Sequence, residues 1–454
     1  MDDHRRAAEH FLTRETQFHL GILPTEQSHP KTRGLAETLQ EDCAAGVRML
    51  QAVDEDVAEV ARRALVGEEV EALVGALAGA LSRGGRVCFS GCGATGRLSI
   101  MLEAMWRRFW LELAERRPEA QAVADRLRDR VISIMTGGDY ALIRSVEGFE
   151  DYVSFGRQQV READLGAGDV LVAISEGGET SSVIGTLLEA TEREARGFFV
   201  FNNPAEILAD RIERSREVIE NPAVTVLDLA TGPMAVSGST RMQATTAELL
   251  VVGTALERAL VRVLPEVLPE VLPAQALEGL PDEWMRTVDG AAQFESLLAD
   301  LASPAAVEAL AEWTDIEHEL HAAGGRITYY GEECLLDIFT DTTERAPTFM
   351  LPPFRKSGDT TSPPSWAFVK SPARRTPEAW RQVLGRPPRC LDWEPELYAE
   401  LGAASSIVAN PLALGREELM RFLIGSEVDA SRTDVHPNAA MTVLLAHELG
   451  SPDA

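Results

Sequence analysis

The stretch GGRVCFSGCGATGRLSI, residues 84–100, decides the fold. Its apolar run at residues 86–91 has the length of a buried strand and ends in a glycine, and a helical pattern begins at about Gly96. A strand that passes through a glycine-rich turn into a helix is typical of the repeating unit of an α/β domain. We therefore expect one strand–loop–helix unit here, with its loop at the carboxyl end of the strand.

Four later stretches repeat this pattern. They are VISIMTGG, DVLVAIS, GFFVFNN and VTVLDLA, at residues 131–138, 169–175, 197–203 and 224–230. Each is apolar over the length of a strand, and helical patterns lie between them, as in a parallel sheet that is covered on both faces. The sequence therefore predicts an α/β three-layer sandwich with a five-stranded parallel sheet, whose ligands bind at the carboxyl ends of the strands.

The length of 454 residues suggests two or three domains. We expect an N-terminal helical segment over residues 1–80, which packs on a first α/β domain at residues 81–264. The prolines of PEVLPEVLP, residues 265–273, are expected to end the helix that closes this domain, because proline removes a helix donor. Residues 265–454 then hold this connection, the rest of the chain and its C-terminal helices.

The later part of the chain echoes the first domain. GGRITYYG, residues 324–331, follows the pattern of GGRVCFSG, residues 84–91: two glycines, an arginine, alternating apolar residues and a glycine. This similarity predicts a second, diverged copy of the domain. We expect SSIVANP, residues 405–411, to form a further strand of that copy.

Charge and composition narrow the possible partners. The net charge of −29 and the sequence pI of about 4.7 disfavour nucleic acid and anionic lipid surfaces. The first residues lack the apolar region of a signal peptide, and no later apolar run is long enough for a bilayer, so we expect a cytoplasmic protein. The five cysteines are scattered, which indicates neither a disulfide framework nor a zinc cluster, and we expect no cofactor and no metal.

Glycines and hydroxyls follow two of the predicted strands. In GCGATGR, residues 91–97, Gly91 and Gly93 let backbone N–H groups face an anion, and Thr95 adds a hydroxyl. The same spacing fits a dinucleotide site, but the next strand lacks the acidic residue at its end that such a site needs. In SEGGET, Ser175 and Thr180 flank two glycines and can donate to a phosphate, although a simple helix cap remains an alternative.

A third hydroxyl-rich segment begins the helix that closes the domain. In SGSTR, Ser239 and Thr240 can cap the helix and Arg241 can reach the same anion as a charged fork, or it can be a solvated helix arginine. Three such helix starts at one edge of one sheet predict a phosphate site. Glu150 follows another strand and can act there as a proton acceptor or a hydroxyl anchor, or it can lie on a solvated helix face.

Taken together, these motifs resemble the sugar-isomerase (SIS) superfamily, in its branch of N-acetylmuramic acid 6-phosphate etherase and glucokinase regulatory protein. TEQSHPKT, residues 25–32, resembles the TEQxNPxT signature of the branch, with His29 in place of asparagine. The glycine loop, residues 137–151, Asn203-Pro204 and GPMAVSGSTRM at residues 232–242 follow in the expected order. The two-copy arrangement most resembles the regulatory protein.

The resemblance implies a phosphosugar site between the loops, completed by a neighbouring copy. Its candidate contacts, carried over by position, are Gly91, Gly93, Thr95, Ser175, Thr180, Ser239, Thr240 and Arg241. The implied ligand is a hexose or amino-sugar 6-phosphate, with a protein partner such as a sugar kinase for a regulator. An internal pseudo-dimer of two copies is compatible with a monomeric protein.

One departure concerns catalysis. Etherases carry a catalytic glutamate in a stretch resembling D-A-S-E-C-P-P-T, and the corresponding position here is Met105, with Glu103 on another helix face. The later stretch DTTERAPTF, residues 341–349, resembles the missing one and places Glu344 at the glutamate. The alternative for Glu344 is a salt bridge to a nearby arginine.

Two functions follow from the resemblance. The first is a sugar-phosphate-responsive regulator, or another protein of carbohydrate-derivative metabolism. The second is an etherase-like carbon–oxygen lyase that releases D-lactate, with Glu150 and Glu344 as candidate acid and base. An aldose–ketose isomerase would use similar loops, but no histidine lies between His29 and His318 to act as its base in the first domain.

Overall fold

The computed structural model describes residues 2–14, 19–146, 148–268, 288–331, 334–371, 373–429 and 440–445. Its first sheet has five strands, all parallel, in the order β2-β1-β3-β4-β5. The strands are β1 (Val87–Gly91), β2 (Val131–Met135), β3 (Val170–Ile174), β4 (Arg196–Phe201) and β5 (Val224–Asp228). The predicted α/β sandwich with a five-stranded parallel sheet is confirmed.

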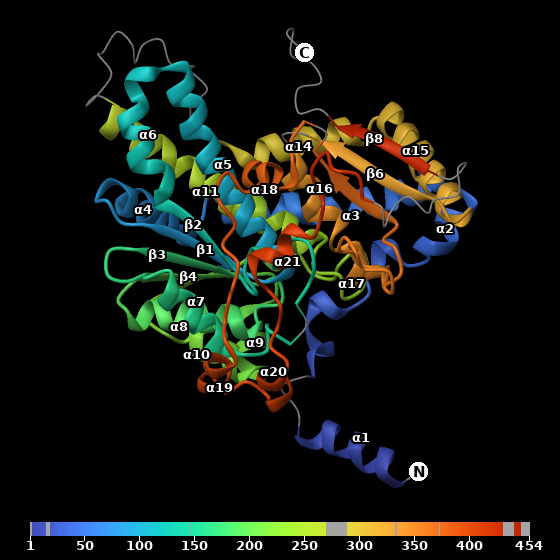
Figure 1. The fold of residues 1–454 in the computed structure, drawn as a ribbon, viewed down its shortest axis with the longest axis horizontal. Helices are drawn as coiled ribbons and strands as arrows, with labels where there is room; N and C mark the ends of the chain where they lie inside the picture. The colour runs from blue at the N-terminus through green and yellow to red at the C-terminus, as the bar shows by residue number, and fades with distance from the viewer. Residues whose placement is uncertain are drawn as a thin grey trace.

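Helices cover both faces of this sheet (Figure 1). Side chains that alternate along a strand point to opposite faces, so Phe89 packs in one core and Cys88 in the other. The core with Phe89 is closed by α4 (Glu68–Ser82), α5 (Gly93–Arg116) and α11 (Gln243–Val267). The core with Cys88 is closed by α7 (Val153–Glu162), α8 (Ser181–Glu192), α9 (Ala205–Arg211) and α10 (Glu213–Ile219).

The N-terminal segment reaches the sheet through short helical turns. It contains α1 (Asp2–Arg14), α2 (Leu35–Glu41) and α3 (Cys43–Ala64), and between the first two lie single turns of 3-10 helix. Val60 and Ala61 of α3 pack into the same core as α4 and α11. The turns at Pro24–Glu26 and Pro30–Thr32 run alongside the loop before α11, where Ser28 forms a parallel bridge with Met234.

The helix α11 ends at Val267, within the proline-rich stretch as expected, and Pro265 lies in its last turn. One expectation for the later chain is wrong. The stretch expected as a strand after residue 404 is the helix α20 (Ser405–Ala409), from which Ile407 and Val408 pack half-buried against the core. Two consecutive β-branched residues were too short a signal to separate a strand from one turn of helix.

A second, smaller sheet lies in the later part of the chain. It has three parallel strands, in the order β7 (Ala367–Lys370), β6 (Arg326–Gly331) and β8 (Ala440–Leu445). The helices of this later part are α14 (Gly290–Leu301), α15 (Pro304–Ala322), α16 (Leu335–Thr342), α17 (Arg345–Phe349), α18 (Thr376–Leu384), α19 (Pro395–Glu400), α20 and α21 (Arg416–Met420). Of these, α19 and α20 lie away from the second sheet, beside α9 and α10 of the first part (Figure 1). The relation of the second sheet to the first as a diverged copy stays a prediction.

The two parts share a core. Phe149 and Phe155 of the first part pack with Trp393 of the second, with ring centroids 5.3 and 5.6 Å away. Ile100 of α5 and Ile327 of β6 belong to the same buried cluster. No helix among the described residues is long and apolar enough to span a membrane.

Candidate functional site

A cavity of about 390 Å³ opens at the carboxyl ends of the first sheet. It lies between the loop after β1, the loop after β3 and the segment that leads into α11, and the later part of the chain adds Glu344. Its lining residues are Glu26, Cys92, Gly93, Ala94, Glu150, Glu176, Gly177, Glu179, Thr180, Val236, Ser237, Gly238, Ser239, Thr240, Arg241 and Glu344. All the hydroxyl-rich helix starts therefore border one hollow.

In the loop after β1, Gly93 faces the cavity while Thr95 holds the turn. Gly93 has a φ of +56°, a left-handed conformation that favours glycine. The Thr95 hydroxyl accepts a hydrogen bond from the Cys92 N–H at 3.0 Å and donates to the Cys92 carbonyl at 2.8 Å. A side chain on Gly91 would collide with the backbone of Thr95 at 2.4 Å. Thr95 and Gly91 thus stabilise the shape of the loop, and neither of them lines the cavity.

The loop after β3 is arranged in the same way. The hydroxyls of Ser175 and Thr180 lie 3.0 Å apart and share a hydrogen bond. Thr180 lines the cavity as the residue before α8, whereas Ser175 is completely buried beneath it. Of this predicted pair, Thr180 can therefore meet a ligand directly and Ser175 can orient the Thr180 hydroxyl.

The segment before α11 supplies the only arginine that lines the cavity among the described residues. Ser239, Thr240 and Arg241 all border the hollow, and the Ser239 hydroxyl is buried without a hydrogen-bond partner in the described structure. Arg241 donates to a carboxylate oxygen of Asp341 at 3.1 Å and to its carbonyl at 3.2 Å. Burial lowers the pKa of Arg241, and the charge of Asp341 partly opposes this by raising it. Arg241 is thus a partly buried fork and not a solvated helix arginine.

The TEQSHPKT segment is tied to these loops. The side-chain amide of Asn203 donates to the Thr25 hydroxyl at 3.0 Å and its oxygen accepts the Thr25 N–H at 3.3 Å. Thr32 donates to the Ala235 carbonyl at 2.8 Å. These contacts place Glu26 in the cavity wall, where burial, and next the charge of Glu179, raises its pKa.

The two carboxylates expected to act as acid and base both line the cavity. Glu150 accepts a hydrogen bond from the Cys92 thiol at 3.1 Å. Glu344 is only 8% exposed and forms an ion pair with Arg97. Arg97 is itself fully buried and also donates to the carbonyls of Leu142 and Ala141 at 3.0 and 3.1 Å. A side-chain carbon on Gly93 would lie 3.8 Å from the Glu344 carboxylate, which shows how closely the two parts approach.

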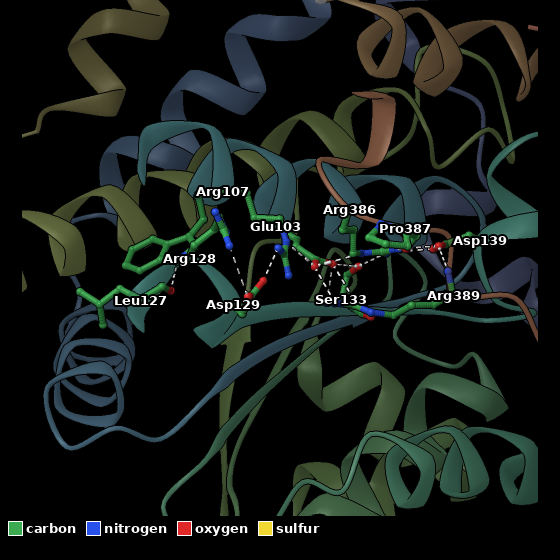
Figure 2. Close-up of polar contacts among 11 residues, drawn as sticks. Glu103, Arg107, Leu127, Arg128, Asp129, Ser133, Asp139, Arg386, Pro387 and Arg389 are labelled. Carbon is green, nitrogen blue, oxygen red and sulfur yellow. Dashed lines mark hydrogen bonds and ion pairs between the residues drawn. The ribbon is translucent and has the colours of Figure 1, made fainter. Parts of the chain in front are cut away.

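Met105, the position that the resemblance aligns with the etherase glutamate, lies away from the cavity. Met105 is 48% exposed on the outer face of α5. Glu103 is 1% exposed and is bound by three arginines on the other side of the helix, as Figure 2 shows. Neither residue can reach a ligand in the cavity, whereas Glu344 lines it.

Glu176, in the cavity wall, and Glu248, which does not line the cavity, are a pair of buried carboxyl groups. Glu176 accepts a hydrogen bond from the Thr245 hydroxyl at 2.9 Å. Burial raises the pKa of Glu176 to about 7, and the Glu150 charge acts in the same direction. Burial and then the charge of Glu176 raise the pKa of Glu248 well above its ordinary value. Glu176 can therefore hold a proton at the cavity wall near neutral pH.

Sequence reasoning missed three of the lining glutamates. Glu26 lay inside the quoted TEQ motif, and Glu176 and Glu179 inside the quoted SEGGET loop, so each was in view without an assigned role. Because most surface glutamates are solvated, only the fold distinguishes these. Glu147, three residues before Glu150, lies outside the described residues. Among those residues no group of three metal-ligating side chains occurs.

An open parallel sheet whose loops enclose a polar hollow at their carboxyl ends defines an α/β ligand-binding protein. Residues 69–191 match the family "Glucokinase regulatory protein N-terminal SIS domain". The chain is 31% identical over 234 residues to N-acetylmuramic acid 6-phosphate etherase of Yersinia pestis (strain Pestoides F), which spans 51% of this chain and 69% of that protein. It is 29% identical over 236 residues to N-acetylmuramic acid 6-phosphate etherase 1 of Bacillus licheniformis, 52% of this chain and 67% of that protein.

Among solved structures, tagatose-6-phosphate ketose/aldose isomerase from Escherichia coli aligns with 71% of this chain and 67% of its own, at 13% identity and a TM-score of 0.35. The sequence matches cover about two thirds of the length of the etherases. The protein belongs to the SIS superfamily, in the branch of the N-acetylmuramic acid 6-phosphate etherases and the glucokinase regulatory protein.

Proposed function

We propose that the cavity binds a sugar phosphate. The observation that carries this proposal is the polarity of the lining, which combines hydroxyls, loop amides and Arg241 with five carboxylates. A phosphate group needs donors and a positive charge, and sugar hydroxyls need acceptors. A volume of about 390 Å³ suits a ligand of this size.

The phosphate end would be formed by the segment before α11. Ser239 has a hydroxyl without a partner in the described structure, and Thr240, Thr180 and Arg241 border the same space. Arg241 now pairs with Asp341 across the boundary between the two parts. A bound phosphate would compete with Asp341 for this guanidinium, so ligand binding would alter a contact between the parts.

The ion pair between Arg241 and Asp341 supports the function of a ligand-responsive regulator. Both ion pairs at the cavity, Arg241 with Asp341 and Arg97 with Glu344, join the first sheet domain to the later part of the chain. A ligand that engages Arg241 and Glu344 would bias how these parts meet, which is the physical requirement for a ligand-dependent surface. The partner would be a protein that reads this surface, for example a sugar kinase.

A second candidate function is an etherase-like lyase, because Glu150 and Glu344 face one cavity. In this reaction a carboxylate removes the proton beside the carbonyl carbon of the open-chain sugar 6-phosphate. The electron pair forms a carbon–carbon double bond and the ether oxygen leaves as lactate, with a proton from the second carboxyl group. Glu344 would then take the place that Met105 cannot fill.

Two measurements on the full chain test these functions. Sugar 6-phosphates should raise the melting temperature, by an amount that corresponds to about 2.7 kcal/mol at a hundred times the dissociation constant, and the same sugars without phosphate should not. Equal shifts from both sets would overturn the binding proposal. Incubation with N-acetylmuramic acid 6-phosphate and an assay for D-lactate separates the lyase from the regulator: lactate release supports the former, and binding without release supports the latter.

A further inference from the structure

A cluster of arginines lies around Glu103 (Figure 2). The cavity that these arginines line shares no residue with the phosphosugar cavity. Glu103 accepts hydrogen bonds from Arg386 at 3.0 Å, from Arg389 at 2.8 and 2.9 Å, and from Arg107 at 2.8 Å. Arg107 belongs to α5, whereas Arg386 and Arg389 follow α18 in the later part of the chain. These bonds lower the pKa of Glu103 to about 2 although burial acts against them, so the carboxylate is charged and keeps the arginines in place.

Further bonds fix two of these arginines. Arg386 donates to Asp139 at 3.0 Å and is 6% exposed. Arg107 is 5% exposed, and it also pairs with Asp129. A side chain on Gly385 would lie 3.5 Å from the aliphatic stem of Arg107, so the loop after α18 packs directly on that stem. The guanidinium groups are therefore held before any ligand arrives.

A cavity of about 520 Å³ opens on this cluster. Four arginines line it, Arg107, Arg128, Arg386 and Arg389, and among the lining residues Asp129 alone carries a negative charge. Glu103 and Asp139 neutralise the inner side of the cluster, and the outer side faces the cavity.

We propose that this cavity is a second anion site, which binds the phosphate group of a small ligand. Arginine forks match phosphate oxygens, and groups that are already fixed lose little entropy on binding. Within the described structure, Nη2 of Arg107 and Nε of Arg389 donate to no protein atom, so both can serve a ligand. Arg128 forms only loose ion pairs, at 3.4 Å to Asp125 and 4.0 Å to Asp129.

Asp129 acts as an internal competitor for the anion. Its side chain is 60% exposed and pairs with Arg107 at the cavity wall. An arriving phosphate would displace this carboxylate from Arg107 and repel it. Removal of the Asp129 charge should therefore strengthen binding, which is the opposite of what the loss of a structural salt bridge would do.

The test is a calorimetric titration of the full chain with inorganic phosphate and, separately, with glucose 6-phosphate, at fixed ionic strength. A Thr240→Glu background places an extra carboxylate in the first cavity and so isolates the second. In this background Arg128→Ala and Arg389→Ala should each weaken binding about tenfold, the loss of one charge-assisted bond, and Asp129→Asn should strengthen it about two- to fivefold. Arg381→Ala, an exposed arginine on α18, removes the same charge elsewhere and should change nothing.

The two ligands distinguish the source of the phosphate. Tighter binding of glucose 6-phosphate than of inorganic phosphate assigns the site to phosphate esters, and the reverse assigns it to the free anion. No saturable binding, equal effects of Arg128→Ala and Arg381→Ala, or weaker binding by Asp129→Asn would each overturn the proposal. Thermal unfolding of each variant confirms that it is folded before its titration is compared.

Discussion

Arg97 and Glu344 form an ion pair at the wall of the phosphosugar cavity, one from the helix after the first strand and the other from the later part of the chain. Arg97 is completely buried and Glu344 is 8% exposed, so neither charge is well solvated. The pair fixes a carboxylate at the point where the glycine loop begins its helix. Its geometry makes the cavity a product of both parts of the chain.

We expect this pair to be essential for stability. Arg97→Ala or Glu344→Ala should each lower the free energy of unfolding by about 3–5 kcal/mol, because the remaining partner becomes a buried, unpaired charge. The double variant Arg97→Ala/Glu344→Ala should cost less than the two single changes together. Urea unfolding measures all three, and strictly additive effects would contradict a direct pair.

Arg241 should decide the affinity for a sugar 6-phosphate. Arg241→Ala should weaken binding about tenfold or more, because a charge-assisted hydrogen bond is lost. Asp341→Asn should strengthen binding, since it frees Arg241 from its present partner. Arg381→Ala provides the matched control for the loss of one arginine. Titration calorimetry measures these affinities, and unchanged binding by Arg241→Ala would place the phosphate elsewhere.

If the protein releases D-lactate, Glu150→Gln and Glu344→Gln should each lower kcat about a hundredfold or more, because each removes a proton-transfer group. The affinity for the substrate should change much less. Glu26→Gln is the matched control, a cavity glutamate on the N-terminal segment with no assigned proton transfer. A loss of kcat in the control as large as in the other two would contradict the assignment.

The buried Glu248 should make stability fall as the pH rises. Its pKa is raised well above the ordinary value of 4.5, so the folded state keeps a proton that the unfolded chain releases. The free energy of unfolding therefore decreases from about pH 4.5 upward, by at most about 1.4 kcal/mol per pH unit for this group. Glu248→Gln should remove this decrease, so its advantage over the parent should grow between about pH 5 and pH 8. Glu213→Gln, an exposed control, should follow the parent.

The phosphosugar cavity should bind one ligand per chain. The strand β6 is followed by a glutamate pair, Glu332 and Glu333, at the place of Cys92 and Gly93 in the first glycine loop, and two carboxylates repel an anion. These two glutamates lie outside the described residues. Calorimetry with a sugar 6-phosphate, in Arg128→Ala to weaken the proposed second anion site, should give a stoichiometry of one. Two equivalent sites would contradict it.

The first sheet could be predicted because its signal is local. The strands β1 to β4 are short apolar runs that are almost entirely buried, whereas β5, at the edge of the sheet, is mostly half-buried. The second sheet was harder to predict. Only GGRITYYG carried a clear pattern, and the strand β8 was not identified because its pairing with β6 depends on residues far away in the chain.

Part of the candidate site could likewise be predicted from the sequence, and part could not. The sequence identified the loops, and Gly93, Thr180, Ser239, Thr240 and Arg241 all line one cavity with Glu150 and Glu344. It could not separate the hydroxyl that meets the cavity from the one behind it, as with Thr180 and Ser175, because both follow the same strand. The capping role of Thr95 and the burial of Glu176 likewise depend on tertiary packing.

The raised pKa of Glu176 makes ligand binding depend on the pH and on the buffer. At about 7, this carboxyl group is only partly ionised under physiological conditions. A phosphate that entered the cavity beside it would raise that pKa further, so the protein would take up protons from the buffer as the ligand binds. Affinity would then fall as the medium becomes alkaline, and the apparent heat of binding would vary with the ionisation enthalpy of the buffer.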